Sequence, residues 1–167
     1  MSGDFSLGTV KVALTPVERF AEFLKSRAMR FTQQRRIIVE HVFSRHEHFD
    51  ADDLIEELAK EKGPRHVSRP TVYRTLAELV EAGLLRKMDL RGRAVYEHDY
   101  GYPPHDHLHC QRCNRLIEFR SEELADIRDA VAREHRFRVS GHRFIVTGTC
   151  FECSRKMKRK KRPLDLI

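Results

Sequence analysis

The chain has 167 residues, of which 40% are hydrophobic and 34% charged, enough for one domain or two small ones with a modest core. No apolar run approaches membrane-spanning length and Met1 to Asp4 do not begin a signal peptide, so we expect a cytoplasmic protein without a membrane partner. The run from Arg155 to Arg162 holds 7 of the 32 basic residues, and 32 − 7 leaves 25 basic against 25 acidic. The net charge of +7 therefore does not by itself indicate nucleic-acid binding. The basic run is equally consistent with attraction to phosphates and with a disordered solubilising tail.

Residues 1–14 are expected to form a disordered leader, and three helices follow it. Thr15-Pro16 opens the first, with the proline placed where its missing N–H costs nothing. Thr32 caps the second helix, and Asp50 caps a third that ends at Gly63-Pro64.

Ser68 is expected to cap a fourth helix, which ends at Gly83, placed as a left-handed cap. Its apolar side repeats at helical spacing. The opposite side offers Arg69, Tyr73 and Arg74 near the N-terminus, where the second helix of a helix-turn-helix places its groove-facing side chains.

Two strands, Leu84–Asp89 and Ala94–Glu97, then form a hairpin around Leu90 to Arg93. Helices followed by a basic-tipped hairpin predict a winged-helix DNA-binding domain over residues 15–97. An ordinary small α+β domain with exposed arginines fits this part equally well.

Residues 98–104 contain a glycine and a proline pair and are expected to form a hinge. A second domain, residues 105–153, follows, and then a basic tail, 154–167. We expect strands at 105–110 and 115–120, a helix capped by Ser121, and strands near 136–139 and 142–148. Such a small α/β unit needs a metal or a partner subunit for stability.

The four cysteines form two Cys-x-x-Cys pairs, Cys110/Cys113 and Cys150/Cys153. Two such pairs complete a tetrahedral four-cysteine zinc site, structural because no ligand position stays open. The alternative is four buried structural thiols.

The segment before the first pair reads His105-Asp106-His107-Leu108-His109. In a strand the three histidines share one face. Imidazole with carboxylate suits Zn, Fe, Mn or Co, so a second metal site is plausible. A solvated polar strand is the alternative.

The order of these motifs resembles the ferric uptake regulator family over about residues 17–153. Three segments carry the resemblance: Pro70-Thr71-Val72-Tyr73-Arg74, His105-Asp106-His107-Leu108 and Ile117-Glu118-Phe119. It implies an α+β protein with an N-terminal winged helix and a C-terminal small α/β dimerisation domain. The expected activity is that of a homodimeric, metal-dependent repressor that binds a double-stranded DNA operator and is not an enzyme.

The resemblance also assigns site residues. The four cysteines match structural zinc ligands, and the regulatory metal would be held by His48, Glu97, His105, His107 and Glu118. The candidates for DNA contact are Arg30, Arg69, Thr71, Tyr73 and Arg74.

An accessory site found in many members departs from the family pattern here. Asp106 and His142 persist, whereas Pro104 and Ala125 stand where two further ligands are expected, so this site is interpreted as degenerate or as a weak accessory metal site.

The sensed metal is expected to be Fe²⁺. Zinc sensors of the family recruit a cysteine, and all four are used, while peroxide sensors carry aspartate where this chain has Glu118. Manganese-, zinc- or peroxide-responsive regulation remains the alternative. Outside the family, a zinc hydrolase lacks a nucleophile or oxyanion motif here, and a metal-storage protein needs no helix-turn-helix. No small organic substrate is expected.

Overall fold

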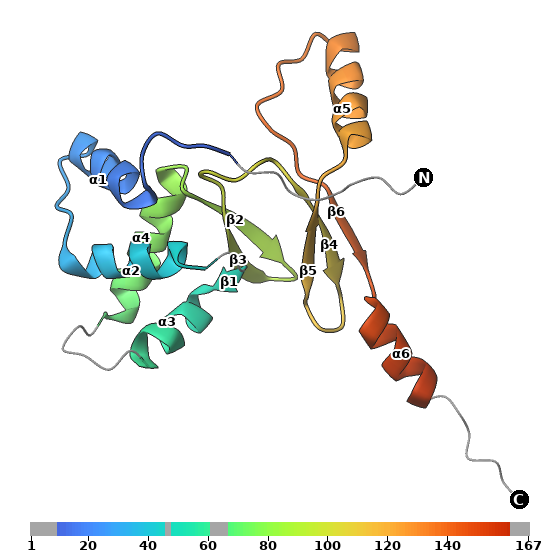
Figure 1. Cartoon of the computed structure of the whole chain (residues 1–167), viewed down its shortest axis with the longest axis horizontal. Coiled ribbons are helices and arrows are strands. Elements are labelled where there is room, and N and C mark those ends of the chain that lie inside the picture. The colour runs from blue at the N-terminus through green and yellow to red at the C-terminus, as the bar shows by residue number, and fades with distance from the viewer. Residues whose placement is uncertain (1–9, 46–47, 61–66, 161–167) are drawn as a thin grey trace, which may run out of the picture. The chain divides into compact units, whose positions relative to one another are not determined.

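The computed structural model describes residues 10–45, 48–60 and 67–160 (Figure 1). The chain divides into two compact units, with the boundary between Pro103 and Pro104. The N-terminal unit holds α1 to α4 with β1 to β3, and the C-terminal unit holds β4 to β6 with α5 and α6.

Four helices make up most of the N-terminal unit: α1 Pro16–Ser26, α2 Gln33–Phe43, α3 Ala51–Lys60 and α4 Arg69–Glu81. Their predicted starts are largely confirmed. Thr15 forms a capping box with Glu18, and the Thr32 hydroxyl accepts from the Arg35 N–H. Asp50 accepts from the Asp53 N–H at 2.8 Å. The expected stop at Gly63-Pro64 lies outside the described residues.

Ser68 stands at the N-cap position of α4, but its side chain makes no capping hydrogen bond. Its hydroxyl lies 2.8 Å from the Thr71 hydroxyl instead. The fourth helix was therefore placed correctly, while the capping function expected of Ser68 was wrong.

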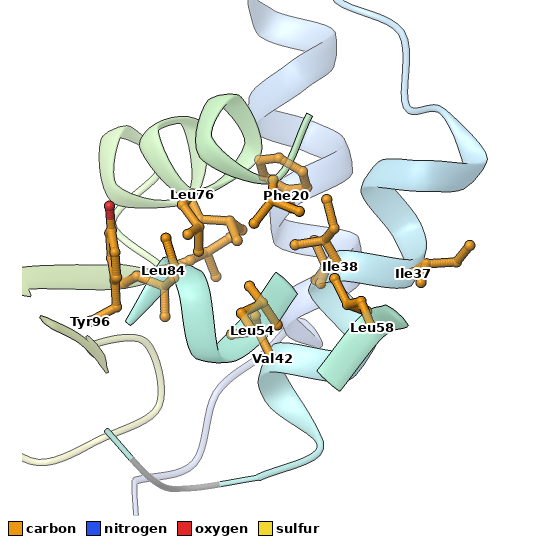
Figure 2. Close-up of a cluster of buried hydrophobic side chains, with 14 of the residues drawn as sticks. Phe20, Ile37, Ile38, Val42, Leu54, Leu58, Leu76, Leu84 and Tyr96 are labelled. Carbon is orange, nitrogen blue, oxygen red and sulfur yellow. The ribbon is translucent and has the colours of Figure 1, made fainter. Parts of the chain in front are cut away.

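One apolar core joins these helices, and Figure 2 shows side chains from each of them converging. Phe20 of α1, Ile38 of α2, Leu54 of α3 and Leu76 of α4 are all essentially inaccessible to solvent. Burying an aliphatic or aromatic side chain of this size stabilises a fold by about 1.5–3 kcal/mol. This core gives α4 a rigid support.

An ion pair adds a directional contact between α2 and α4. Arg35 donates from Nε to Glu78 Oε2 at 2.8 Å and from Nη2 to Glu78 Oε1 at 2.5 Å. Both side chains are nearly buried, and a bidentate pair of this kind fixes geometry as well as charge. It constrains how α4 lies against α2.

A three-stranded antiparallel sheet completes the unit, with the order β1-β3-β2. The predicted hairpin is confirmed as β2 Leu85–Leu90 and β3 Arg93–His98. Its turn consists of Arg91 and Gly92, which both have positive φ, 61° and 81°, as a two-residue hairpin turn of the I′ type requires. Strand β1, Phe49–Asp50, was not predicted because two residues carry no periodic signal. Helices plus hairpin make the unit a winged helix.

The first residues of the expected hinge belong to this unit. His98 ends β3, is buried, and lies with Nε2 3.0 Å from the Val42 carbonyl oxygen. The Tyr100 hydroxyl donates to the Leu14 carbonyl. Packing against α2 and the segment before α1 thus extends ordered structure past residue 97.

The C-terminal unit has a mixed sheet of order β5-β4-β6, formed by β4 Asp106–Cys110, β5 Leu116–Phe119 and β6 Ile145–Gly148. Strand β4 pairs antiparallel with β5 and parallel with β6. Helix α5, Glu122–Glu134, lies in the connection between β5 and β6. Its predicted cap Ser121 accepts from the Leu124 N–H.

One expectation for this unit was wrong, and two further segments differ from what the sequence indicated. No strand forms at 136–139: among the described residues this segment finds no pairing partner, and the Phe137 side chain is 69% exposed. The first part of the presumed tail is helical, since α6 spans Phe151–Lys160. The strand expected at 142–148 is shorter, beginning at Ile145.

The described part of the C-terminal unit buries little apolar surface. Cys110 is its one buried apolar side chain there, whereas Ile127, Val131 and Phe151 are more than half exposed. Stability of this unit therefore has to come from other interactions, as its small size predicts. Every helix of the described chain falls short of the length and apolar character that a bilayer-crossing helix needs.

Candidate metal centres and DNA-binding helix

The four cysteines converge on one point in the C-terminal unit. Cys110 ends β4, Cys113 follows in the turn before β5, and Cys150 and Cys153 flank the start of α6. Their sulfur atoms all lie within 4.8 Å of one another. The turn is tight because Asn114 adopts a positive φ of 57° and donates its N–H to the Cys110 carbonyl.

The spacing of the thiols fits a tetrahedral metal. The Sγ atoms of Cys113 and Cys150 are 3.8 Å apart. A tetrahedron with metal–sulfur bonds of about 2.3 Å has edges of about 3.8 Å. Backbone N–H groups, that of Cys150 first, lower the pKa of Cys110 to about 5, whereas hydrogen bonding to Cys150 raises the pKa of Cys153 to about 12. The protein's own groups thus stabilise the thiolate of Cys110 and disfavour that of Cys153, and a bound cation would offset the second effect.

A second donor group lies on β4 and β5. His107 pairs with Glu118 across the two strands, and His105 shares its face two residues earlier. The rings of His105 and His107 are 4.8 Å apart between centroids, and His105 Nε2 is 3.8 Å from Glu118 Oε1. Both histidines are buried, so this strand is not the solvated polar strand of the alternative interpretation.

The N-terminal unit holds two further candidates. His48 Nε2 lies 3.4 Å from Glu97 Oε2, and the Glu97 side chain is only 4% exposed. Arg86 approaches the other oxygen of Glu97 at 3.7 Å and pairs with Asp99 at 2.6 Å. His48 and Glu97 thus form an imidazole–carboxylate pair beside a fixed cation.

Asp106 and His142 also come together. His142 Nε2 is 3.3 Å from Asp106 Oδ1, while Arg128 Nη1 is 3.0 Å from His142 Nδ1. The Arg128 guanidinium therefore supplies a positive charge beside Asp106 and His142 without a metal ion. Across the described residues, groups of at least three donors occur around the cysteines and around His105, His107 and Glu118, and Asp106 and His142 belong to neither.

The polar side of α4 carries the predicted groove-facing residues. Arg69 and Arg74 are exposed, Tyr73 is 45% exposed, and Thr71 is half-buried. Arg30 lies apart from them, exposed before α2, with its carbonyl accepting from Arg35 Nη1.

One contact of this surface was missed from the sequence. Asp52, in the first turn of α3, accepts on one oxygen from Arg69 Nη2 at 2.6 Å and from the Tyr73 hydroxyl at 3.2 Å. In the sequence, an acidic residue in the first turn of a helix such as Asp52 is ordinarily interpreted as stabilising the helix dipole. No local pattern connects it to residues 17 and 21 positions away.

Comparison with known proteins decides the family. The family model described as "Ferric uptake regulator family" matches residues 26–147. The chain belongs to the ferric uptake regulator family. A "Ferric uptake regulation protein" from Neisseria gonorrhoeae is 33% identical over 148 residues, 86% of this chain and 100% of the relative. A "Peroxide operon regulator" from Bacillus subtilis is 33% identical over 135 residues, 81% and 91% of the two chains.

A solved structure supports the fold. The ferric uptake regulator of Helicobacter pylori superposes with a TM-score of 0.76 at 20% identity, covering 88% of this chain and 97% of that one. The predicted α+β architecture is therefore confirmed. Membership of the family makes the chain a metal-responsive DNA-binding regulator and not an enzyme.

Proposed function

We propose that this chain is an iron(II)-responsive repressor that binds its operator as a homodimer in the cytoplasm. One observation narrows the choice of metal. All four thiols lie together in one cluster, so the remaining candidate ligands are imidazoles and carboxylates. Such a set suits Fe²⁺, Mn²⁺ or Co²⁺, and it also binds Zn²⁺.

The cysteine cluster would hold structural zinc. Four thiolates leave no open position for a substrate or water, which is the donor set of a structural site. In a unit with one buried apolar side chain among its described residues, such a site contributes directly to folding free energy. The free thiols also fit a reducing compartment.

The regulatory metal would be held by His48, Glu97, His105, His107 and Glu118, as the family resemblance assigns them. Geometry within each unit supports this, since each unit brings its own imidazole and carboxylate within 4 Å. Ligands contributed by two units restrict how those units move when they serve one ion. A metal that binds one arrangement more tightly shifts the population toward it.

An apolar sheet face supports homodimerisation. Leu108 of β4 pairs with Ile117 of β5 and Val146 of β6, and the three side chains are 40%, 43% and 41% exposed. This face is opposite the one that carries His107, because successive strand residues alternate. A second copy would cover it, and a two-fold dimer implies a two-fold symmetric operator.

DNA recognition would use the exposed side of α4. Tyr73 would contact base edges and Arg74 a phosphate, with Arg69, Thr71 and Arg30 as further contacts. Sequence preference would then depend chiefly on Tyr73, and overall affinity on the arginines.

The test is operator binding by protein that retains one zinc equivalent. The operator is first selected from random duplexes, and binding is then titrated anaerobically with Fe²⁺, Mn²⁺, Co²⁺ and Zn²⁺. Activation should require metal beyond the structural equivalent and should fail in His105→Ala and Glu97→Gln. His135→Ala and Glu134→Gln, which alter exposed residues, are the matched controls and should respond like wild type.

Two outcomes would change the assignment. Full operator affinity without added metal would refute metal sensing. Activation by zinc alone at the free concentrations of a cell would make the protein a zinc sensor, and loss of binding on peroxide treatment of the iron form would make it a peroxide sensor.

A further inference from the structure

Helix α6 continues directly from the cysteine cluster. Cys153 lies in its first turn, and the Ser154 N–H donates to the Cys150 carbonyl at 2.9 Å. Arg115, just before β5, donates from Nη1 and Nη2 to both oxygens of Glu152, at 3.0 and 2.9 Å. The start of α6 is thus held to the turn after β4 by the thiol cluster and by a bidentate ion pair.

The charged side chains of this helix are nearly all of one sign. After Cys153 it carries Arg155, Lys156, Lys158, Arg159 and Lys160, and no acidic residue. Its one acid, Glu152, is already paired with Arg115. Arg155 and Lys156 are exposed. With two more basic residues directly after the helix, this run accounts for the whole formal excess of the chain, because the rest balances at 25 basic and 25 acidic.

This density of positive charge destabilises the helix unless a bound anion offsets it. Like charges four apart, such as Arg155 and Arg159, destabilise a helix. A solubilising surface works with both signs interspersed, so solubility does not require an all-cationic run. Helical residues rise about 1.5 Å each, and duplex DNA carries one charge per about 1.7 Å of its axis, so the two densities match.

We propose that α6 is a second DNA-contacting element, which binds the phosphate backbone irrespective of base sequence. This inference rests on the proposed binding of DNA by α4. Residues 1–97 carry 17 basic and 15 acidic residues, so the winged-helix unit adds little long-range attraction to DNA. Helix α6 supplies that attraction, and the cysteine cluster presents it on a fixed element rather than on a loose tail.

DNA fits this helix better than an anionic lipid surface does. A helix that lies on a membrane needs an apolar face to insert. Among the side chains described in α6, Phe151 is the one large apolar group, and the Arg155 guanidinium lies 5.5 Å from its ring centroid.

The test measures the salt dependence of binding to non-operator duplex by the full-length, zinc-loaded protein. The variant replaces the basic residues of the helix: Arg155→Gln, Lys156→Gln, Lys158→Gln, Arg159→Gln and Lys160→Gln. Each phosphate contact contributes about 0.9 to the slope of log K against log salt, so five contacts contribute about 4.5. Between 50 and 200 mM salt, wild type should lose about 500-fold more affinity than the variant.

A matched control removes the same charge from exposed arginines elsewhere in the C-terminal unit: Arg112→Gln, Arg120→Gln, Arg133→Gln, Arg136→Gln and Arg138→Gln. Its slope should stay close to that of wild type. Zinc content and circular dichroism verify that both variants are folded.

Each outcome separates this inference from the proposed function. An unchanged slope in the α6 variant, with metal-dependent operator binding intact, overturns the inference alone. A reduced slope in a protein whose operator binding ignores metal supports the inference and refutes metal sensing. Loss of binding to phosphatidylserine vesicles with an unchanged DNA slope would show a membrane-directed helix and would also overturn the proposal.

Discussion

Removing Glu78 tests the link between α2 and α4. Its side chain is 10% exposed and that of Arg35 13%, and both carboxylate oxygens accept from the guanidinium. In Glu78→Ala, Arg35 loses both of its hydrogen bonds to α4. It keeps its hydrogen bond to the Arg30 carbonyl, in the loop before α2. A nearly buried guanidinium is then left without its counter-ion.

The expected cost is about 3–5 kcal/mol, the range for breaking a buried pair by removing one partner. A winged-helix unit of this size shifts its melting temperature by about 4–8 °C per kcal/mol, so a drop of at least about 12 °C is expected. The double variant Arg35→Met, Glu78→Leu removes both charges and should recover most of the loss, because well-packed apolar replacements of such pairs are about neutral.

The assay is urea unfolding followed by far-UV circular dichroism, with operator binding measured in parallel at a temperature where each variant is folded. Glu81→Ala is the matched control, since Glu81 lies on the same helix in a pair whose side chains are both 58% exposed. A cost below about 1 kcal/mol for Glu78→Ala would place the pair among surface ion pairs and refute its role in positioning α4.

Further predictions concern the other sites. Cys153→Ser should release the structural metal and unfold the C-terminal unit while the winged helix stays folded, and a metal-free variant with an unchanged hydrogen-exchange pattern would contradict this. Tyr73→Ala should narrow the difference between operator and non-operator affinity, by about 1–3 kcal/mol if the ring contacts one base pair, whereas Arg74→Ala should weaken both alike; a competition binding assay distinguishes the two. Asp50→Ala should cost about 1–2 kcal/mol in urea unfolding by removing the cap of α3, and Asp50→Asn, which keeps a capping oxygen, should cost less. The pKa of Glu57 is lowered, chiefly by its hydrogen bond with the Arg45 side chain. The Glu57 carboxylate therefore adds stability to the fold above its usual pKa, and this stability is lost as the pH falls through the folded-state pKa. In Arg45→Gln the pKa of Glu57 should rise toward 4.5, and an NMR titration that shows no change would refute the assignment.

Local signals were sufficient for the helices of the N-terminal unit and for the hairpin. Thr15, Thr32 and Asp50 act on backbone groups within three residues, so their function can be read from spacing. The cysteine pairs were equally clear because metal chelation demands a short separation.

Interactions between distant residues were the ones the sequence did not reveal. Arg35 and Glu78 are 43 residues apart, and nothing in either helix marks them as partners. The expected strand at 136–139 failed for a related reason. Alternating apolar residues such as Phe137 and Val139 satisfy the strand pattern, but a strand also needs an edge to pair with, and that depends on the whole sheet.

The parallel pairing of β4 with β6 has a consequence for the life of the protein in a cell. His107 pairs with Ile145, so this contact closes only after a long segment has been synthesised. Contacts between residues far apart in sequence form slowly, and here few apolar groups would hold them before the proposed structural zinc binds the thiols. A new chain in zinc-poor medium would therefore remain half-folded and open to proteases for longer. We expect its half-life in a pulse-chase experiment to shorten when zinc is withheld, so that zinc supply would set the amount of this regulator whichever metal it senses.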